Sequence, residues 1–276
     1  MLLKRFVKTT LSVLIMAAAL GYASFSNAVL TPYSQNFDGL GATDPSALDL
    51  VGGDQWYIFA EVWNGEVGTG TFIYDYGVFS APNGGPGFSA IDFGEGQIGL
   101  VTDQYLNIYS DYNNVDHGNS FNINTSVFQE RTLDATDVAS GTWTFSGDFK
   151  APSVDGIAEP ASNAVASVFI KTLDPTNGYA TTNDIRFDST IADPVNWGNF
   201  SISLDLSDPA LEGQILQFGF NTIATDYDDS GVYYDNLCFD NDGSCSAPAV
   251  SSSSSGAVSL FGLVLPGLIG LAKRMV

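Results

Sequence analysis

An acidic stretch near the end of the chain, Asp226-Tyr227-Asp228-Asp229-Ser230-Gly231, holds the side chains best placed to do chemistry. Its carboxylates and hydroxyl crowd oxygen atoms into a few residues, and the glycine allows a tight turn. Calcium takes about six to eight oxygen ligands from carboxylates, amides and backbone carbonyls. The stretch therefore favours a bound divalent cation, with a solvated hairpin loop as the alternative.

The order of these residues matches only the beginning of a helical calcium loop. Oxygen-bearing side chains at the first, third and fifth positions and a glycine at the sixth are how an EF-hand loop starts. The twelfth position is Leu237 instead of glutamate, and the flanking segments Gln217–Asn221 and Val232–Phe239 alternate like strands. A second oxygen cluster, Asp240-Asn241-Asp242-Gly243, is interpreted as a turn.

That turn lies between the only two cysteines, Cys238 and Cys245. Its Asp-Gly pair can reverse the chain and bring the two thiols together. A disulfide is allowed in an exported chain, whereas a zinc site would need more ligands than one distant histidine, His117, supplies. The spacing therefore predicts a Cys238–Cys245 disulfide.

Catalytic groups are hard to find. A Ser-His-Asp arrangement would have to use His117, which lies in a turn-like loop, and no Gly-x-Ser-x-Gly elbow accompanies it. A glycosidase needs two carboxylates at a suitable separation. Acidic residues are so numerous that the candidates have little weight: Glu61, Glu66, Glu95 and Glu130.

Tyrosines beside asparagines could bind a sugar, because sugars pack their C–H faces on aromatic rings next to polar groups. Tyr105, Tyr109 and Tyr112 precede Asn113 and Asn114 and are the candidate ligand-binding residues. Most other aromatic side chains are expected in the core. Glycan binding without catalysis is therefore one function to consider, beside a carbohydrate-active enzyme with paired carboxylates and a purely structural surface protein.

The N-terminus reads as a secretory signal peptide over residues 1–28. A basic beginning, a short apolar run over residues 11–20 and the small residues Ser26-Asn27-Ala28 follow the usual order of such signals. The apolar run is too short to span a bilayer. We therefore expect the chain to be exported.

The C-terminus also reads as a targeting signal. Residues 247–255 form a serine-rich linker, and residues 256–276 form an apolar segment that ends in Lys273 and Arg274. This arrangement resembles the bacterial sorting signals of the GlyGly-CTERM and PEP-CTERM type. The resemblance implies a transient membrane anchor, removal by a membrane sorting protease, and a cell-surface or extracellular destination. Gly256 is followed by Ala257, and no Pro-Glu-Pro is present, so the type of protease stays open, and an ordinary transmembrane anchor is the alternative.

The region between the two signals is strongly acidic. All 31 acidic residues of the chain lie in it, but only four of the nine basic residues do, which leaves a formal charge of −27. Such a charge excludes nucleic acid and anionic lipid as natural partners. It favours divalent cations, with solubility in salt as the alternative. The four basic residues are Arg131, Lys150, Lys171 and Arg186.

Residues 29–246 are predicted to form one all-β domain, an antiparallel β-sandwich. Short alternating segments are separated by turn residues, and no helical repeat or βαβ pattern is found. The expected strands are Tyr33–Phe37, Trp56–Val62, Thr71–Tyr76, Gly87–Phe93, Tyr105–Tyr109, Ser120–Thr132, Thr142–Lys150, Ala164–Thr172, Asn183–Asp188, Asn199–Leu206, Gln214–Asn221 and Val232–Phe239.

The first and last strands, with Asn36-Phe37-Asp38-Gly39 and Tyr233-Tyr234-Asp235-Asn236-Leu237, resemble those of jelly-roll sandwiches in carbohydrate-binding modules and related surface domains. The resemblance implies that the two strands lie close together and hold a structural calcium ion. Asp38 and Asp235 would be its main ligands, with Asp226 or Asp228 contributing. We therefore expect a surface-sorted, calcium-stabilised, non-enzymatic module whose partners are glycans or surface matrix components.

Overall fold

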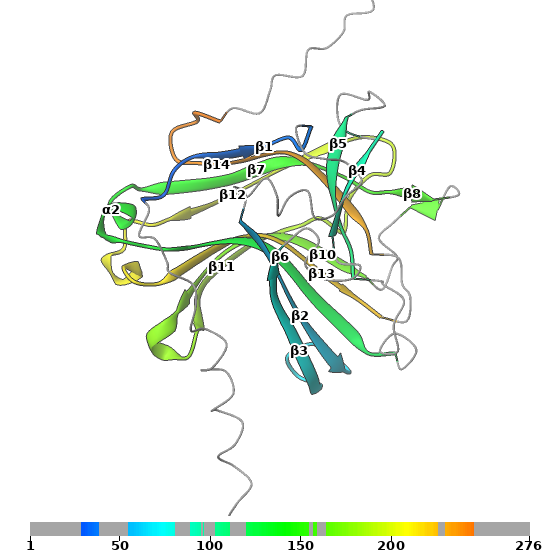
Figure 1. The fold of residues 1–276 in the computed structure, drawn as a ribbon, viewed down its shortest axis with the longest axis horizontal. Coiled ribbons are helices and arrows are strands. Elements are labelled where there is room, and N and C mark those ends of the chain that lie inside the picture. The colour runs from blue at the N-terminus through cyan, green and yellow to red at the C-terminus, as the bar shows by residue number, and fades with distance from the viewer. Residues whose placement is uncertain are drawn as a thin grey trace, which may run out of the picture.

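The computed structural model describes residues 29–38, 55–80, 89–94, 96, 103–110, 120–154, 157–158, 164–225 and 230–245. Within these residues two six-stranded antiparallel sheets face each other (Figure 1). The predicted antiparallel β-sandwich is confirmed. The expected signal peptide, serine-rich linker and C-terminal apolar segment lie outside the described residues.

The first sheet, here called sheet A, contains both ends of the domain. The first strand of the domain along the chain pairs with the last one, with Tyr33 opposite Phe239 and Gln35 opposite Leu237. The predicted proximity of these two strands is therefore confirmed. In order across the sheet the strands are β12 (Gly198–Asp205), β7 (Thr142–Lys150), β14 (Val232–Asp240), β5 (Gln104–Ile108) and β4 (Ser89–Phe93), with β1 (Tyr33–Gln35) beside β14.

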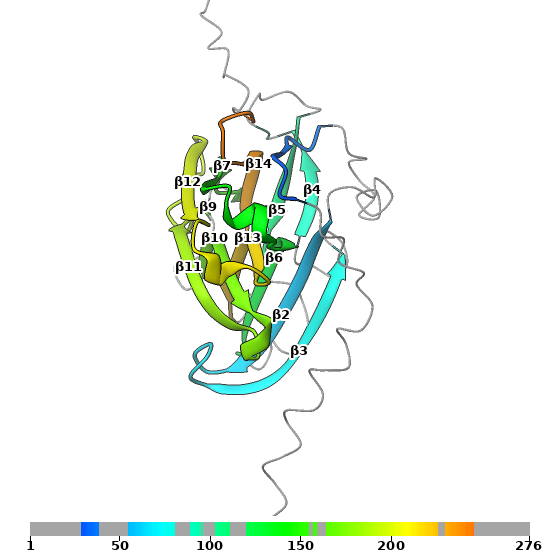
Figure 2. The same cartoon turned by 90° about the vertical axis from the view of Figure 1, so that its left-hand side faces the viewer.

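The second sheet, sheet B, is built mainly from long strands. Figure 2 shows β11 and β12 along one side of the sandwich, with β2 and β3 curving along the other. In order across the sheet the strands are β11 (Ala180–Asp188), β10 (Val165–Asp174), β13 (Ile215–Ala224), β6 (Asn122–Thr132), β2 (Trp56–Asn64) and β3 (Thr71–Ser80).

Short elements connect these strands. The helix α2 begins after Asp134, whose side chain caps the backbone N–H of Thr136 and Asp137. Asp137 Oδ1 in turn accepts from the backbone N–H of Leu30 at 2.7 Å, which ties the beginning of the domain to this turn. The short elements are β8 (Ser153–Val154), β9 (Ile157–Ala158), α2 (Ala135–Val138), η2 (Pro175–Asn177) and η3 (Pro209–Leu211). Among the described residues no helix is long and apolar enough to cross a membrane.

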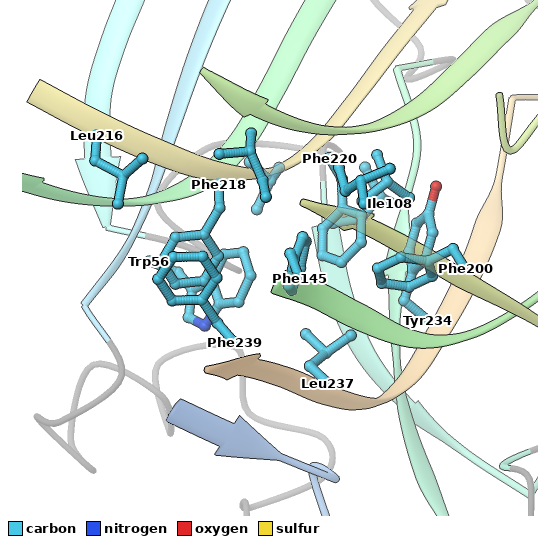
Figure 3. Packing of buried hydrophobic residues seen from close by; sticks show 14 of the residues in the cluster. Trp56, Ile108, Phe145, Phe200, Leu216, Phe218, Phe220, Tyr234, Leu237 and Phe239 are labelled. Atoms are coloured by element: carbon cyan, nitrogen blue, oxygen red, sulfur yellow. The ribbon is translucent and has the colours of Figure 1, made fainter. Parts of the chain in front are cut away.

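Aromatic rings from both sheets fill the space between them (Figure 3). Phe218 of β13 stacks on Phe239 of β14 with ring centroids 4.0 Å apart, and Phe220 stacks on Tyr234 at 3.9 Å. These rings alternate along their strands with outward-facing residues, as a half-buried strand requires. The alternation that predicted the strands is therefore what builds the core.

The predicted disulfide between Cys238 and Cys245 is present, with the two Cα atoms 5.7 Å apart. It closes the turn after β14. Asp240 Oδ2 accepts from the backbone N–H of Cys245 at 3.0 Å, and Asp242 Oδ1 accepts from that of Ser244 at 2.8 Å. These carboxylates stabilise the turn, in agreement with the interpretation of residues 240–243.

Candidate functional site

Asp235 is buried on β14, with 1% of its surface exposed. Its Oδ1 accepts from the backbone N–H of Asn236 at 2.6 Å. Directly opposite on β7 lies Asp148, which is 2% exposed. The strand register slips just after Asp235, so this carboxylate pair sits at a bulge.

Sequence reasoning missed Asp148 because β7 and β14 are far apart along the chain. Side-chain amides of Asn199 and Asn236 donate to its two carboxylate oxygens, the latter at 2.8 Å. Burial raises the pKa of Asp148, and these two hydrogen bonds oppose the rise. Two buried carboxylates facing each other favour a proton or a cation between them.

Asp38 follows β1 and is exposed. One carboxylate oxygen accepts from the backbone N–H of Gln104 at 3.0 Å, and the other from the side-chain amide of Asn36 at 2.9 Å. Asp38 therefore bridges the beginning of β5 and the end of β1. Asp226 and Asp228, the other two expected calcium ligands, lie outside the described residues.

The described residues alone do not assemble a complete calcium site. Within them, the only group of three potential ligands whose donor atoms lie within 4.8 Å of one another is Cys238, Asp240 and Cys245. The two sulfur atoms are bonded to each other, so this group is not a metal site. A calcium ion at Asp235 would need Asp148 and oxygens from outside the described residues.

Of the candidate sugar-binding tyrosines, Tyr105 lies on β5 of sheet A and Tyr109 directly follows that strand. Tyr105 is only 4% exposed, and its ring centroid lies 4.2 Å from that of Tyr233. Its face is therefore already covered. Tyr109 is partly exposed, and Tyr112 lies outside the described residues, as does His117.

The outer face of sheet B carries a second polar surface, which sequence reasoning did not identify. Neighbouring side chains of a strand point to opposite faces, so residues that alternate with the core side chains share this face. We call it the sheet B face. Its members used below are Glu61, Trp63, Asn124, Phe128, Glu130, Ser167, Phe169, Lys171, Asp184, Arg186, Gln217, Gly219 and Asn221.

A chain of hydrogen bonds crosses this face. Arg186 Nη1 donates to Asn221 Oδ1 at 3.2 Å, and Asn221 Nδ2 donates to Asn124 Oδ1 at 2.7 Å. Asn124 Nδ2 then donates to Glu61 Oε2 at 3.0 Å, which also accepts from Trp63 Nε1 at 3.4 Å. Strands β11, β13, β6 and β2 therefore hold one connected set of planar polar groups.

Two cations lie over buried phenyl rings on the same face. Lys171 Nζ is 4.7 Å from the centroid of Phe169 and 5.9 Å from that of Phe128. Arg186 Cζ is 5.7 Å from the centroid of Phe169. Both rings are almost fully buried, and Gly219 lies between them in register. Two of the four cations of the acidic region therefore meet over one ring.

Burial shifts the pKa values of two side chains on this face, Lys171 and Glu130. Burial and, to a smaller extent, the neighbouring Arg186 together lower the pKa of Lys171 to about 8. Burial also raises the pKa of Glu130, although a 2.6 Å hydrogen bond from Gln217 Nε2 to Glu130 Oε2 opposes this. The face is therefore partly dry and its polar groups interact strongly.

The structure separates two of the candidate catalytic carboxylates. Glu61 lies opposite Asn124 on β6, and Glu130 lies six residues further along that strand. At about 3.3 Å per residue this places their Cα atoms roughly 20 Å apart. Glycosidase carboxyl groups lie about 5–9.5 Å apart. Glu61 and Glu130 therefore do not form such a pair, and Glu95 lies outside the described residues.

No protein-family model and no curated protein matches the chain. Among solved structures, the fold is similar to the CBM22-1–GH10 modules of Clostridium thermocellum xylanase 10B (TM-score 0.36, 11% identity, 69% of this chain and 26% of that one, so about a quarter of its length). It is also similar to a family 11 carbohydrate-binding module of that organism, with a TM-score of 0.35 and 10% identity over 77% of this chain and 96% of that one. A third similar structure is the Stig cyclase Fisc of Fischerella sp. TAU, with a TM-score of 0.40 and 10% identity over 76% of this chain and 97% of that one. These likenesses concern the β-sandwich fold alone.

Proposed function

We propose that this protein is an exported, non-catalytic module that binds a glycan on the sheet B face. The observation that supports this most is the hydrogen-bond chain from Arg186 to Trp63 beside aromatic rings. Sugars offer closely spaced hydroxyl groups that both donate and accept, together with C–H faces that pack on rings. The planar side chains of this network fix one another's orientation through their hydrogen bonds. They can therefore bind sugar hydroxyl groups with little further loss of rotamer entropy.

The partly exposed members of the network are the ones that a ligand reaches. Glu61, Trp63, Asn124 and Arg186 each keep exposed surface, whereas Asn221 is only 6% exposed and supports them from below. The Glu61 carboxylate is held in place by its two donors. This arrangement suits binding better than proton transfer, because the candidate partner Glu130 lies too far away.

A carbohydrate-active enzyme and a purely structural surface protein are the alternatives. Hydrolysis of a neutral polysaccharide by the purified protein, with new reducing ends accumulating over time, would favour the enzyme. Absence of both binding and turnover across a broad polysaccharide panel would favour the structural role. Tyr109, on the other sheet, marks the alternative binding surface.

The binding test is affinity electrophoresis of residues 29–246 through gels that contain one neutral polysaccharide each, including xylan and mixed-linkage β-glucan. The proposal expects one of them to retard the protein and Trp63→Ala to lose most of that retardation. Trp197→Ala, which replaces a tryptophan just before β12 of sheet A, is the matched control. Equal retardation of both variants and loss only in Tyr109→Ala would move the site to the outer side of sheet A.

A structural calcium ion at Asp235 is a second part of the proposal. The facing, buried carboxylates of Asp235 and Asp148 support it, since a divalent cation would offset their repulsion. Asp38 lies after β1, the strand that pairs with β14, and Asp226 and Asp228 would supply further oxygens. The ion would hold the first and last strands together and take no part in any reaction.

Thermal unfolding with excess calcium and then with a chelator tests this part. A rise in melting temperature that Asp235→Asn abolishes is expected. Asp75→Asn, at an exposed position on β3 of sheet B, should leave the rise intact. An unchanged melting temperature in the wild type would refute the calcium site but leave the glycan proposal untouched.

Export and sorting complete the proposal. Residues 1–28 would direct secretion, and residues 256–276 would anchor the chain until a membrane sorting protease removes them. Glycans or other matrix components of the cell surface would then be the partners. Cell fractionation of the full-length chain, compared with a chain ending at residue 255, tests this, with loss of the membrane-bound precursor as the expected result.

A further inference from the structure

The ammonium group of Lys171 has three hydrogen-bond donors and no acceptor among the described residues. No hydrogen bond from Nζ is formed, and no carboxylate of the described residues is close enough to make an ion pair with it. Its contacts are the Phe169 and Phe128 rings below it. Lys171 keeps some exposed surface, so an oxygen atom of a ligand can reach this group and accept a hydrogen bond from it.

The charged groups around Lys171 come from three strands. Arg186 and Asp184 face it from β11, Glu130 from β6 and Glu61 from β2. Each of these carboxylates already has another partner. Asp184 accepts from Arg186 Nε at 3.0 Å, and Gln217 donates to Glu130. Glu61 holds Asn124 and Trp63, as described above.

We propose that Lys171 Nζ is the donor that binds a hydroxyl oxygen of a neutral sugar on the sheet B face. This rests on the proposed glycan-binding function and adds the donor and the ligand class to it. The bound hydroxyl accepts from Lys171 and donates its own proton toward Glu61 or Glu130, which retain acceptor capacity. A vicinal diol satisfies both kinds of group at once.

The local charge favours a neutral sugar over a sugar acid. Three carboxylates act on Lys171 against one guanidinium, and that guanidinium is paired with Asp184. A uronate would meet repulsion from Glu61 and Glu130 in addition to the −22 formal charge of the chain. A hydroxyl carries no charge and meets no such repulsion.

A hydrogen bond to the ammonium form links binding to pH. The free group has a pKa of about 8, and an acceptor oxygen stabilises its protonated form, so the pKa is higher in the complex. Affinity is therefore greatest below pH 8 and falls as the pH rises above it.

The test compares binding of the retarding neutral polysaccharide by wild type, Lys171→Met and Lys171→Arg between pH 7 and pH 9.5. Lys171→Met should bind about tenfold more weakly at pH 7, the usual effect of one hydrogen bond to a charged group. Lys171→Arg should recover part of the affinity and lose the pH dependence. Lys150→Met, which replaces a lysine of β7 in sheet A, should match the wild type.

Each outcome has one meaning. Wild-type affinity in Lys171→Met, with loss of binding in Trp63→Ala, refutes the role of Lys171 and keeps the glycan proposal. Preference for a glucuronate-substituted glycan over its neutral parent, lost in Lys171→Met, refutes the neutral ligand. Absence of binding to every polysaccharide overturns both proposals. Unchanged thermal unfolding cooperativity shows that each variant is folded.

Discussion

The protonated side chain of Lys171 should lower the free energy of unfolding of the domain. Burial and Arg186 lower its pKa from 10.5 to about 8, and one pKa unit corresponds to about 1.4 kcal/mol. The protonated ammonium therefore costs the folded state about 3 kcal/mol relative to an exposed lysine. The contacts with Phe169 and Phe128 return about 1 kcal/mol. Lys171→Met, with a side chain of similar length and no charge, should raise the free energy of unfolding at pH 7 by about 2 kcal/mol.

The stability difference between the wild type and Lys171→Met should depend on pH in a defined direction. Below pH 8 both folded and unfolded states bind the proton, and the full cost of burial is present. Between pH 8 and pH 10.5 the unfolded state binds more protons at Lys171 than the folded state does, so the wild type gains stability with rising pH. The advantage of Lys171→Met should therefore shrink across this interval and disappear above it.

Urea unfolding at pH 7, 8, 9 and 10 measures both quantities, and the difference between wild type and variant removes the titration of all other groups. A constant difference across this range, or a variant less stable than the wild type at pH 7, would refute the reasoning. A lysine that costs stability in this way is consistent with a functional role, since binding groups are often retained at the expense of stability.

Three further changes test the packing. Tyr234→Phe removes a 2.7 Å hydrogen bond to Ser189 Oγ between two fully buried groups; unfolding should be easier by about 1–2 kcal/mol, and an unchanged urea midpoint would contradict this. Gly219→Ala places a Cβ 2.6 Å from the Phe128 Cα and against the Val127 carbonyl. The free energy of unfolding should fall by about 1–3 kcal/mol, and a rise would show that β13 shifts to make room for the methyl group. Cys238→Ser with Cys245→Ser opens a short covalent loop; the melting temperature should fall by an amount equivalent to about 2 kcal/mol, and the reduced wild type should behave alike.

The strands could be predicted from the sequence because each follows from its own residues. In β2, Ile58, Ala60 and Val62 alternate with larger polar or aromatic side chains, and the same pattern recurs along the chain. The disulfide followed from the turn between Cys238 and Cys245. Boundaries were less accurate: β11 begins at Ala180 instead of Asn183, because pairing with β10 extends it past the last alternating residue.

The sheet B face could not be predicted, because it depends on strand register. Arg186 meets Phe169 only through the pairing of β10 with β11, and Asn221 meets Asn124 across β13 and β6. Register is set by the packed core and turns, and a shift of one residue would send every side chain to the other face. The same holds for Asp148, which reaches Asp235 through β7 and β14.

A weak signal was nevertheless present in the sequence. In β10, Ser167, Phe169 and Lys171 alternate with Val168 and Ile170, which predicts a polar face on an otherwise apolar strand. Lys171 and Arg186 are also two of the four cations within residues 29–246. Scarce residues of one charge on a strongly charged chain are candidates for specific contacts, and both lie at the centre of the sheet B face.

The most direct test of the glycan site is an NMR footprint. Backbone and side-chain amide signals of residues 29–246 would be followed while the retarding polysaccharide, cut to short oligosaccharides, is added. Our account predicts the largest shifts at the Trp63 indole, the Asn124 amide and the Arg186 guanidinium on the sheet B face. Shifts confined to Tyr109 and Tyr233 on sheet A would contradict it.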